Sequence, residues 1–121
     1  MQRLLYHAPD NPNQESPFDR AIVQVVQGQN VSIVSPYIGL QYLHRLIGLS
    51  ASWRLISDVL EWLSATPVRE RVAVFEFLKI HDGLVHHYPA IHAKAVVSRV
   101  GAYTGSANLT DAGVLRRTEF G

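Results

Sequence analysis

Four polar side chains in the stretch IHAKAVVSRVGAYTGSANLT, residues 91–110, have types and spacing that suit chemistry. They are His92, Lys94, Ser106 and Asn108. An imidazole is a nucleophile or a base, a lysine carries positive charge, and hydroxyl and carboxamide groups donate hydrogen bonds. A phosphodiester is an anion, so attack on it needs a neutral nucleophile and positive charge and donors around its oxygens. The set is therefore suited to phosphodiester cleavage.

Two consecutive strands are expected to bring these side chains together. Successive residues of a strand face opposite sides of a sheet. A strand over Ile91–Ser98 therefore places His92 and Lys94 on one face. A second strand over Ala102–Asn108 does the same for the serine and the asparagine, and residues 99–101 are few enough for a hairpin.

The chain before this stretch alternates helical and strand patterns, with Gly, Pro, Asn and Asp between them. Ser16 and Asp58 are predicted to cap helices, and Gly28 to end one. Strands that alternate with helices predict an α/β sheet. We expect, in order, a helix over Pro17–Val26, a strand over Val31–Val34, a helix over Leu40–Leu49, a strand over Trp53–Ile56, a helix over Val59–Leu63, a helix from Pro67 to Ile80 and a short strand within Gly83–Tyr88.

Composition limits the classes of protein to consider. The chain has 121 residues, of which 47% are apolar and 17% charged, so it is long and apolar enough for one folded domain. A net charge of +1 excludes a strong general attraction to nucleic acid. The chain has no cysteine. We see no signal-peptide pattern and no apolar run near the roughly 18 residues of a membrane span, so the expected location is the cytoplasm.

The motif His92-x-Lys94 followed by Gly105-Ser106-x-Asn108 resembles the phospholipase D-like superfamily, phosphodiesterases that carry an HKD motif. This family often has a glutamate on the strand after the asparagine, and here Glu119 fits that place. A weaker likeness extends over most of the chain, through the strand that ends SPYIG. The sequence departs from the motif at one position, because the family's aspartate, five residues after the lysine, is Arg99 here.

This resemblance implies a phospholipase D-like α/β fold, a mixed sheet flanked by helices. It would occupy residues 1–121 as a single domain, either alone or as the amino-terminal part of a longer protein. The resemblance also implies a covalent phosphohistidine, here on His92, with charge from Lys94 and neither metal nor cofactor. Ser106 and Asn108 would donate hydrogen bonds, and Glu119 would fix the tautomer of the imidazole.

Two further residues are predicted to contact substrate. Gly105 belongs to the motif itself. Tyr37 follows the strand over Val31–Val34, and open α/β sheets bind their ligands beyond the carboxyl ends of the strands. Tyr37 is equally consistent with an aromatic side chain packed in the core.

One histidine cannot be both the nucleophile and the acid that protonates the leaving group. The resemblance therefore implies a homodimer or a second motif-bearing domain. Nucleic acid is the expected substrate, because small members without a signal or lipid-binding elements are more often nucleases.

Two alternatives stay open. One is a degenerate domain that binds DNA or a protein partner without cleavage, which Arg99 favours. The other is a lipid phosphodiesterase, which needs an exposed apolar patch or an amphipathic membrane helix.

Each candidate also has a purely structural interpretation. His92 alone is typical of a buried histidine bonded to a carbonyl, and Ser106 and Asn108 are good turn residues. A metal site built from His86, His87 and His92 is a weak hypothesis. Adjacent histidines of a strand face opposite sides, and no cysteine or aspartate cluster completes the ligand set.

Overall fold

In the computed structural model, residues 17–105 are described. This part of the chain contains four α-helices, one short 3₁₀ turn and five strands. Their bounds are α1 Pro17–Val26, β1 Asn30–Val34, α2 Leu40–Leu49, β2 Ser52–Ser57, α3 Val59–Ala65, η1 Val68–Glu70, α4 Arg71–Ile80, β3 Val85–His87, β4 Ala95–Ser98 and β5 Gly101–Thr104.

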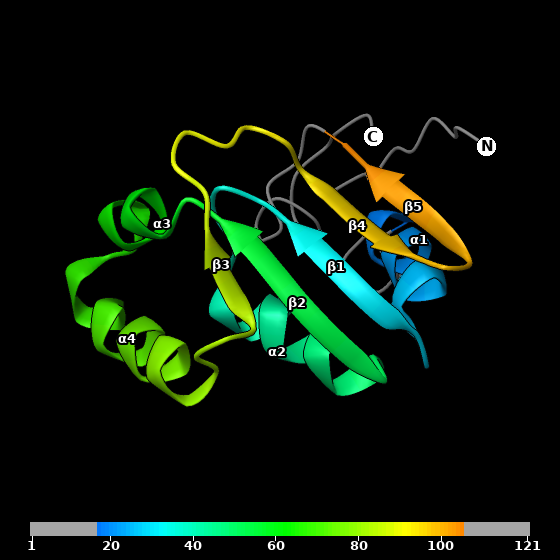
Figure 1. The fold of residues 1–121 in the computed structure, drawn as a ribbon, viewed down its shortest axis with the longest axis horizontal. Coiled ribbons are helices and arrows are strands. Elements are labelled where there is room, and N and C mark those ends of the chain that lie inside the picture. Colours follow the sequence, from blue (N-terminus) through cyan, green and yellow to red (C-terminus); the bar gives the residue numbers. More distant parts are fainter. Residues whose placement is uncertain (1–16, 106–121) are drawn as a thin grey trace.

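The five strands form one mixed sheet in the order β3-β2-β1-β4-β5. β1, β2 and β3 run parallel, whereas β4 is antiparallel to β1 and forms a hairpin with β5. The carboxyl ends of the three parallel strands therefore meet the start of β4 at one edge of the sheet (Figure 1). At this level the predicted class is confirmed, because the described chain is a mixed α/β domain.

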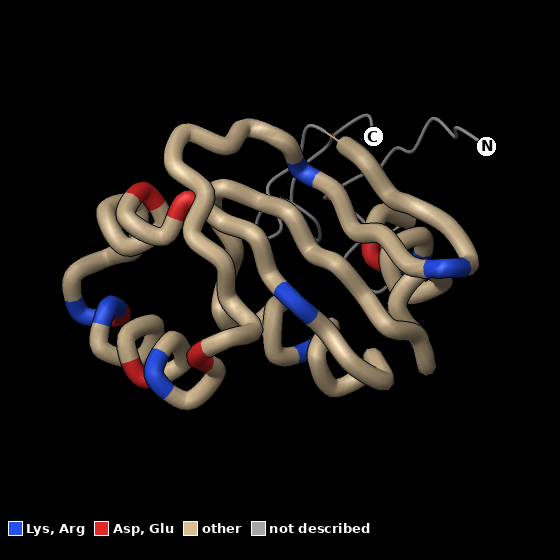
Figure 2. The backbone as a smooth tube through the Cα atoms, viewed as in Figure 1, with Lys and Arg blue, Asp and Glu red and all other residues tan. Residues whose placement is uncertain are grey.

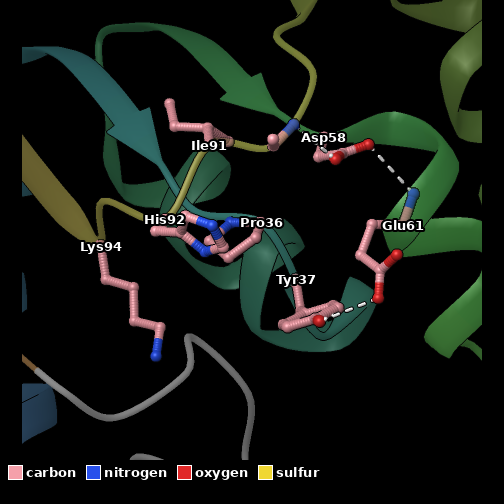
Figure 3. Close-up of a pocket in the computed structure, with 8 residues that line it drawn as sticks. Pro36, Tyr37, Asp58, Glu61, Ile91, His92 and Lys94 are labelled. Carbon is pink, nitrogen blue, oxygen red and sulfur yellow. Dashed lines mark hydrogen bonds between the residues drawn. The ribbon is translucent and has the colours of Figure 1, made fainter.

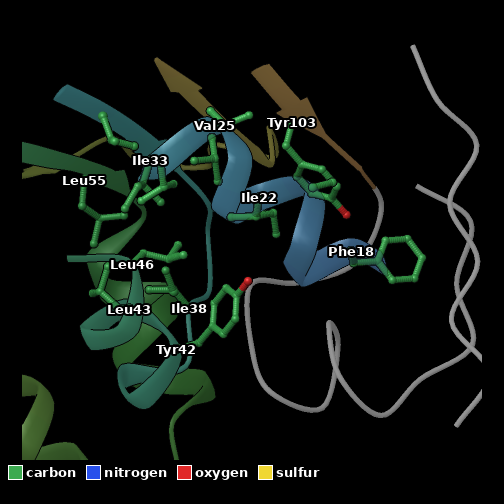
Figure 4. Close-up of a cluster of buried hydrophobic side chains, with 14 of the residues drawn as sticks. Phe18, Ile22, Val25, Ile33, Ile38, Tyr42, Leu43, Leu46, Leu55 and Tyr103 are labelled. Atoms are coloured by element: carbon green, nitrogen blue, oxygen red, sulfur yellow. The ribbon is translucent and has the colours of Figure 1, made fainter. Parts of the chain in front are cut away.

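The apolar faces of α1 and α2 pack on one side of this sheet and form the core, and Figure 1 shows both helices behind the strands. In α1, Ile22 and Val25 recur at helical spacing and are buried. Ile33 of β1 and Leu55 of β2 are buried on the side that faces these helices, as Figure 4 shows. The alternation of buried and exposed residues in the strands thus decides which face of the sheet packs against α1 and α2.

α3 and α4 lie beside β3 at the other end of the sheet (Figure 1). α4 is anchored by the buried ring of Phe77. This ring stacks on Trp53 of β2 with ring centroids 5.7 Å apart and meets Trp62 of α3 at 6.3 Å. No helix within residues 17–105 combines the length and the apolar character that crossing a membrane requires.

The strand predicted over Ile91–Ser98 is wrong in its first half. β4 begins at Ala95, and residues 91–94 have no regular secondary structure. Pairing between β1 and β4 stops where Val34 lies opposite Ala95. The chain after β1 then leaves the sheet through Pro36, which has no backbone N–H to offer a partner strand. The histidine and lysine of the motif therefore precede the strand.

The predicted hairpin is confirmed over its described part. β5 spans Gly101–Thr104 and pairs with β4, so the strand expected over Ala102–Asn108 begins one residue earlier. Residues after 105 lie outside the described part of the chain. The structure of the serine–asparagine end of that strand is therefore not described.

The helix predicted from Pro67 to Ile80 is wrong in its first turn. Residues Val68–Glu70 form the 3₁₀ turn η1, and α4 begins at Arg71. The Arg71 guanidinium donates to the carbonyl oxygens of Thr66 and Ser64, at 3.0 and 3.2 Å. These bonds tie the start of α4 to the end of α3, and the tighter 3₁₀ turn serves as the connector.

Candidate active site

A pocket of ≈ 490 Å³ lies at the edge of the sheet where the parallel strands end, as Figure 3 shows. Its volume is within the range of small-molecule sites, roughly 300–1,000 Å³. Three connections supply its walls: the loop after β1, the junction of β2 with α3, and the segment before β4. The lining residues are Pro36, Tyr37, Asp58, Glu61, Ala90, Ile91, His92 and Lys94.

His92 and Lys94 both line this pocket, although neither lies in a strand. His92 is exposed, and Lys94 is partly buried next to the start of β4. Within residues 17–105, no hydrogen bond to the His92 ring is present. The imidazole is therefore accessible to a substrate, and a lysine lines the same wall of the pocket.

Tyr37 lies at the carboxyl end of β1, in the same pocket. Its hydroxyl donates to Oε1 of Glu61 at 3.0 Å. This hydrogen bond, with smaller contributions from burial and from nearby carboxylates, raises the pKa of Tyr37 above its ordinary value. The phenol therefore stays protonated at neutral pH, and its single proton is donated to Glu61.

Asp58 is a pocket residue that the sequence identified only as a helix cap. Its Oδ1 accepts from the backbone N–H of Glu61 at 3.1 Å, which confirms the cap, and its Oδ2 accepts from the N–H of Ala90 at 2.8 Å. The Ala90 bond and then the Glu61 bond lower the pKa of Asp58. The available signal was the pair Asp58-x-x-Glu61 directly after a buried strand, where ligand sites of α/β sheets occur.

Gly105 is the last described residue and lies next to the pocket region. Because Ala95 pairs with Thr104, Lys94 and Gly105 leave the sheet side by side. A Cβ atom at Gly105 would be 2.9 Å from the hydroxyl oxygen of Tyr103, a buried residue. This close approach explains a glycine here. The remaining predicted site residues, Ser106, Asn108 and Glu119, lie outside the described residues.

Arg99 lies in the turn between β4 and β5, where the hairpin connection was expected, and is exposed. This turn is at the opposite end of β4 from His92 and Lys94. A side chain at position 99 is therefore separated from the pocket by the length of the strand. The motif's missing aspartate thus leaves no gap in the described walls of the pocket.

The adjacent histidines His86 and His87 are both exposed on β3. The Nδ1 atom of His87 accepts from the backbone N–H of Val59 at 3.0 Å, so this nitrogen is already engaged. No group of three or more His, Cys, Asp or Glu side chains in residues 17–105 is arranged to hold a metal ion.

Negative and positive side chains lie at different places along this edge of the sheet. Figure 2 shows acidic positions around the start of α3 and a basic position just before β4. In the pocket these are Asp58 and Glu61 on one wall and Lys94 on the other. The anionic part of a ligand is therefore expected on the side of the lysine and histidine.

No protein-family model matches the chain. Comparisons with curated proteins and with solved structures give no significant match. The likeness to the phospholipase D-like superfamily therefore rests on the motif residues themselves, namely His92, Lys94, Gly105, Ser106 and Asn108.

Proposed function

We propose that the chain is a metal-independent phosphodiesterase of the phospholipase D-like type that acts on nucleic acid. One observation carries this function: the accessible imidazole of His92 and the ammonium of Lys94 line one pocket at the carboxyl edge of a mixed α/β sheet. Open α/β sheets commonly bind ligands at such an edge. The pair supplies a nucleophile and the positive charge that an anionic ester requires.

His92 acts as the nucleophile in this reaction. A neutral ring nitrogen attacks phosphorus and forms the N–P bond, while the bond from phosphorus to the leaving oxygen breaks and that oxygen takes up a proton. Water then cleaves the N–P bond and releases the phosphate monoester. Lys94 neutralises charge on the equatorial oxygens as a point cation, and Tyr37 lines the same pocket with its hydroxyl bonded to Glu61.

The proton for the leaving oxygen comes from a second histidine. The chain carries one His-x-Lys motif, and in-line transfer wants acid and nucleophile on opposite sides of phosphorus. A second copy of the chain, or a second motif-bearing domain, supplies it. A two-fold dimer suits this role because an isologous interface repeats the same surface on both subunits.

A lipid phosphodiester is the second candidate substrate, and one structural observation favours it. Val68 of η1 and Val72 and Phe75 of α4 are 73%, 67% and 53% exposed. Val72 and Phe75 are three residues apart, so they share one face of α4. Exposed apolar side chains on a helix are a feature of proteins that lie on membranes.

The function is tested with bis(p-nitrophenyl) phosphate, plasmid DNA and phosphatidylcholine vesicles as substrates, each with excess EDTA. We expect cleavage of the first two to persist in EDTA and to fall by at least about a thousandfold in His92→Ala, since the nucleophile is lost. His86→Ala is the matched control, because His86 is an exposed histidine of β3 that does not line the pocket.

Three results would contradict this assignment in different ways. Activity that is lost in EDTA and restored by a divalent metal would replace the histidine mechanism with a metal site. Cleavage of vesicles but not of plasmid would identify a lipid phosphodiesterase. Absence of cleavage in the wild-type chain, together with retained DNA binding, would identify a domain that binds without cutting.

A further inference from the structure

Two hydrogen bonds join the start of α3 to the chain that leads from β3 to the motif. Oδ2 of Asp58 accepts from the N–H of Ala90 at 2.8 Å, two residues before His92. Nδ1 of His87 accepts from the N–H of Val59 at 3.0 Å. In the first bond the acceptor, Asp58, precedes α3. In the second bond the acceptor, His87, belongs to β3. The two segments are therefore joined by hydrogen bonds in both directions.

Two further backbone hydrogen bonds lie in the segment between β3 and β4. The N–H of Tyr88 donates to the carbonyl of Ser57 at 2.9 Å, and the N–H of Ile91 reaches the carbonyl of Tyr88 at 3.4 Å. Ala90 has a φ of 60°, in the left-handed region that residues with a Cβ seldom adopt. The bond from its N–H to a carboxylate is charge-assisted and so offsets the cost of this conformation.

We propose that Asp58 is a positioning residue that sets the place of His92 and Lys94 by holding the backbone at Ala90. This role rests on the phosphodiesterase function proposed for the same pocket. Asp58 lies at the junction between β2 and α3, two regular elements, whereas the motif residues lie in an irregular segment. A nucleophile on such a segment needs an outside support to stay in line with phosphorus.

The two oxygens of an aspartate suit this role. One oxygen caps α3 and the other holds Ala90, so both bonds form at once. In Asp58→Asn one carboxylate oxygen is replaced by an NH₂ group, which cannot accept a hydrogen bond. Only one of the two N–H groups, that of Glu61 or that of Ala90, can then be bonded. Asp58→Ser keeps a good helix cap but has a single short hydroxyl. When the remaining oxygen of either variant caps α3, no oxygen is left to accept from the N–H of Ala90, so the support is lost while the helix can still begin.

The experiment compares Asp58→Asn and Asp58→Ser with two controls. Leu60→Gly weakens α3 at an exposed position without touching either hydrogen bond. Glu76→Gln removes an exposed carboxylate of α4 that does not line the pocket. In both Asp58 variants we expect kcat to fall by about tenfold with KM within threefold, because positioning acts on the bound transition state. Neither control is expected to show this kcat–KM split.

Nuclear magnetic resonance gives a readout independent of activity. We expect the Ala90 amide to exchange at least about tenfold faster in both Asp58 variants, since its acceptor is lost, and the resonances of His92 and Lys94 to shift. Leu60→Gly should leave these signals in place. Unchanged His92 and Lys94 resonances in folded Asp58 variants would overturn the proposal. An inactive wild-type chain would instead refute the phosphodiesterase function, while the resonance shifts would still decide the role of Asp58.

Discussion

Lys94 is the charged residue on the histidine side of the pocket, whereas the opposite wall carries carboxylates. In the proposed reaction, such a lysine stabilises negative charge on phosphorus as the transition state forms. It also offsets the unfavourable field of Asp58 and Glu61 on an incoming anion. At the scale of single residues, charge is therefore distributed asymmetrically in the pocket.

Substitution of Lys94 tests this charge directly. We expect Lys94→Ala to lower kcat/KM by about 100- to 1,000-fold, the usual cost of removing one charge-stabilising group, and Lys94→Arg to retain part of the activity. Lys79→Ala is the matched control, because Lys79 is exposed on α4 and does not line the pocket. Equal losses in Lys94→Ala and Lys79→Ala would show that only general electrostatic attraction is involved.

Asp58 makes stability depend on pH in a defined direction. The N–H groups of Ala90 and then of Glu61 lower its pKa in the folded chain, and His87 on β3 adds to the effect. A lowered folded pKa stabilises the fold above the unfolded pKa and loses this contribution as pH falls through the folded pKa. We therefore expect the stability difference between wild type and Asp58→Asn to be largest above about pH 4 and to shrink below it.

Urea unfolding of both chains between about pH 7 and pH 2.5 measures this difference across the relevant range. Glu76→Gln is a suitable control, since Glu76 is an exposed carboxylate of α4 away from the pocket. A stability difference between wild type and Asp58→Asn that stays constant with pH would contradict the role given to the Ala90 bond.

At the scale of elements, a buried carboxylate joins the two helices of the core. Asp19 of α1 is 3% exposed. It accepts from the Tyr42 hydroxyl at 2.7 Å and from Nη2 of Arg45 at 2.8 Å, both on α2. Burial, and then the neighbouring carboxylate, raise the pKa of Tyr42, so its phenol remains a donor. These bonds fix the angle and register of α1 against α2.

Removal of this carboxylate should be costly. We expect Asp19→Ala to lower the free energy of unfolding by about 2–3 kcal/mol, because the buried Tyr42 hydroxyl loses its acceptor and Arg45 loses its ion pair. The side chain of Arg45 is 45% exposed, so Arg45→Gln should cost less, under about 1.5 kcal/mol. Chemical denaturation of the three chains measures both values. Equal losses would mean that the Tyr42 bond contributes little.

At the scale of the whole molecule, one chain supplies one of the two histidines that the proposed mechanism needs. Two copies with their pockets facing each other would bring two Lys94 side chains to one phosphate. Their mutual repulsion is relieved when an anion binds, so phosphate should favour the dimer. If a second motif-bearing domain takes the place of the second copy, a bound anion should likewise relieve the repulsion between the two lysines.

Assembly is therefore expected to respond to anions and to limit activity. Sedimentation velocity of this chain should show more dimer with phosphate than with chloride at equal ionic strength. Specific activity should rise with protein concentration until the dimer is saturated. A monomer whose activity per chain is independent of concentration would rule out a site shared between two copies.

The sequence alone determined the local features of this protein. Periodic apolar residues predicted α2 over Leu40–Leu49 and a strand ending at Val34, and both are observed with those limits. The capping role of Asp58 also followed from its type and place. These features depend on neighbours within a few residues, since spacing decides which face a segment can bury and a cap bonds only the first turn of its helix.

Only the tertiary structure decided where strands stop and which loops meet. The motif segment 91–94 is irregular because its neighbour β1 ends at Val34 and turns away through Pro36. Asp58 meets Ala90 because β3 lies parallel to β2, which brings the ends of both strands to one edge. Pairing partners far away in the chain set these limits, and no local pattern of residues encodes them.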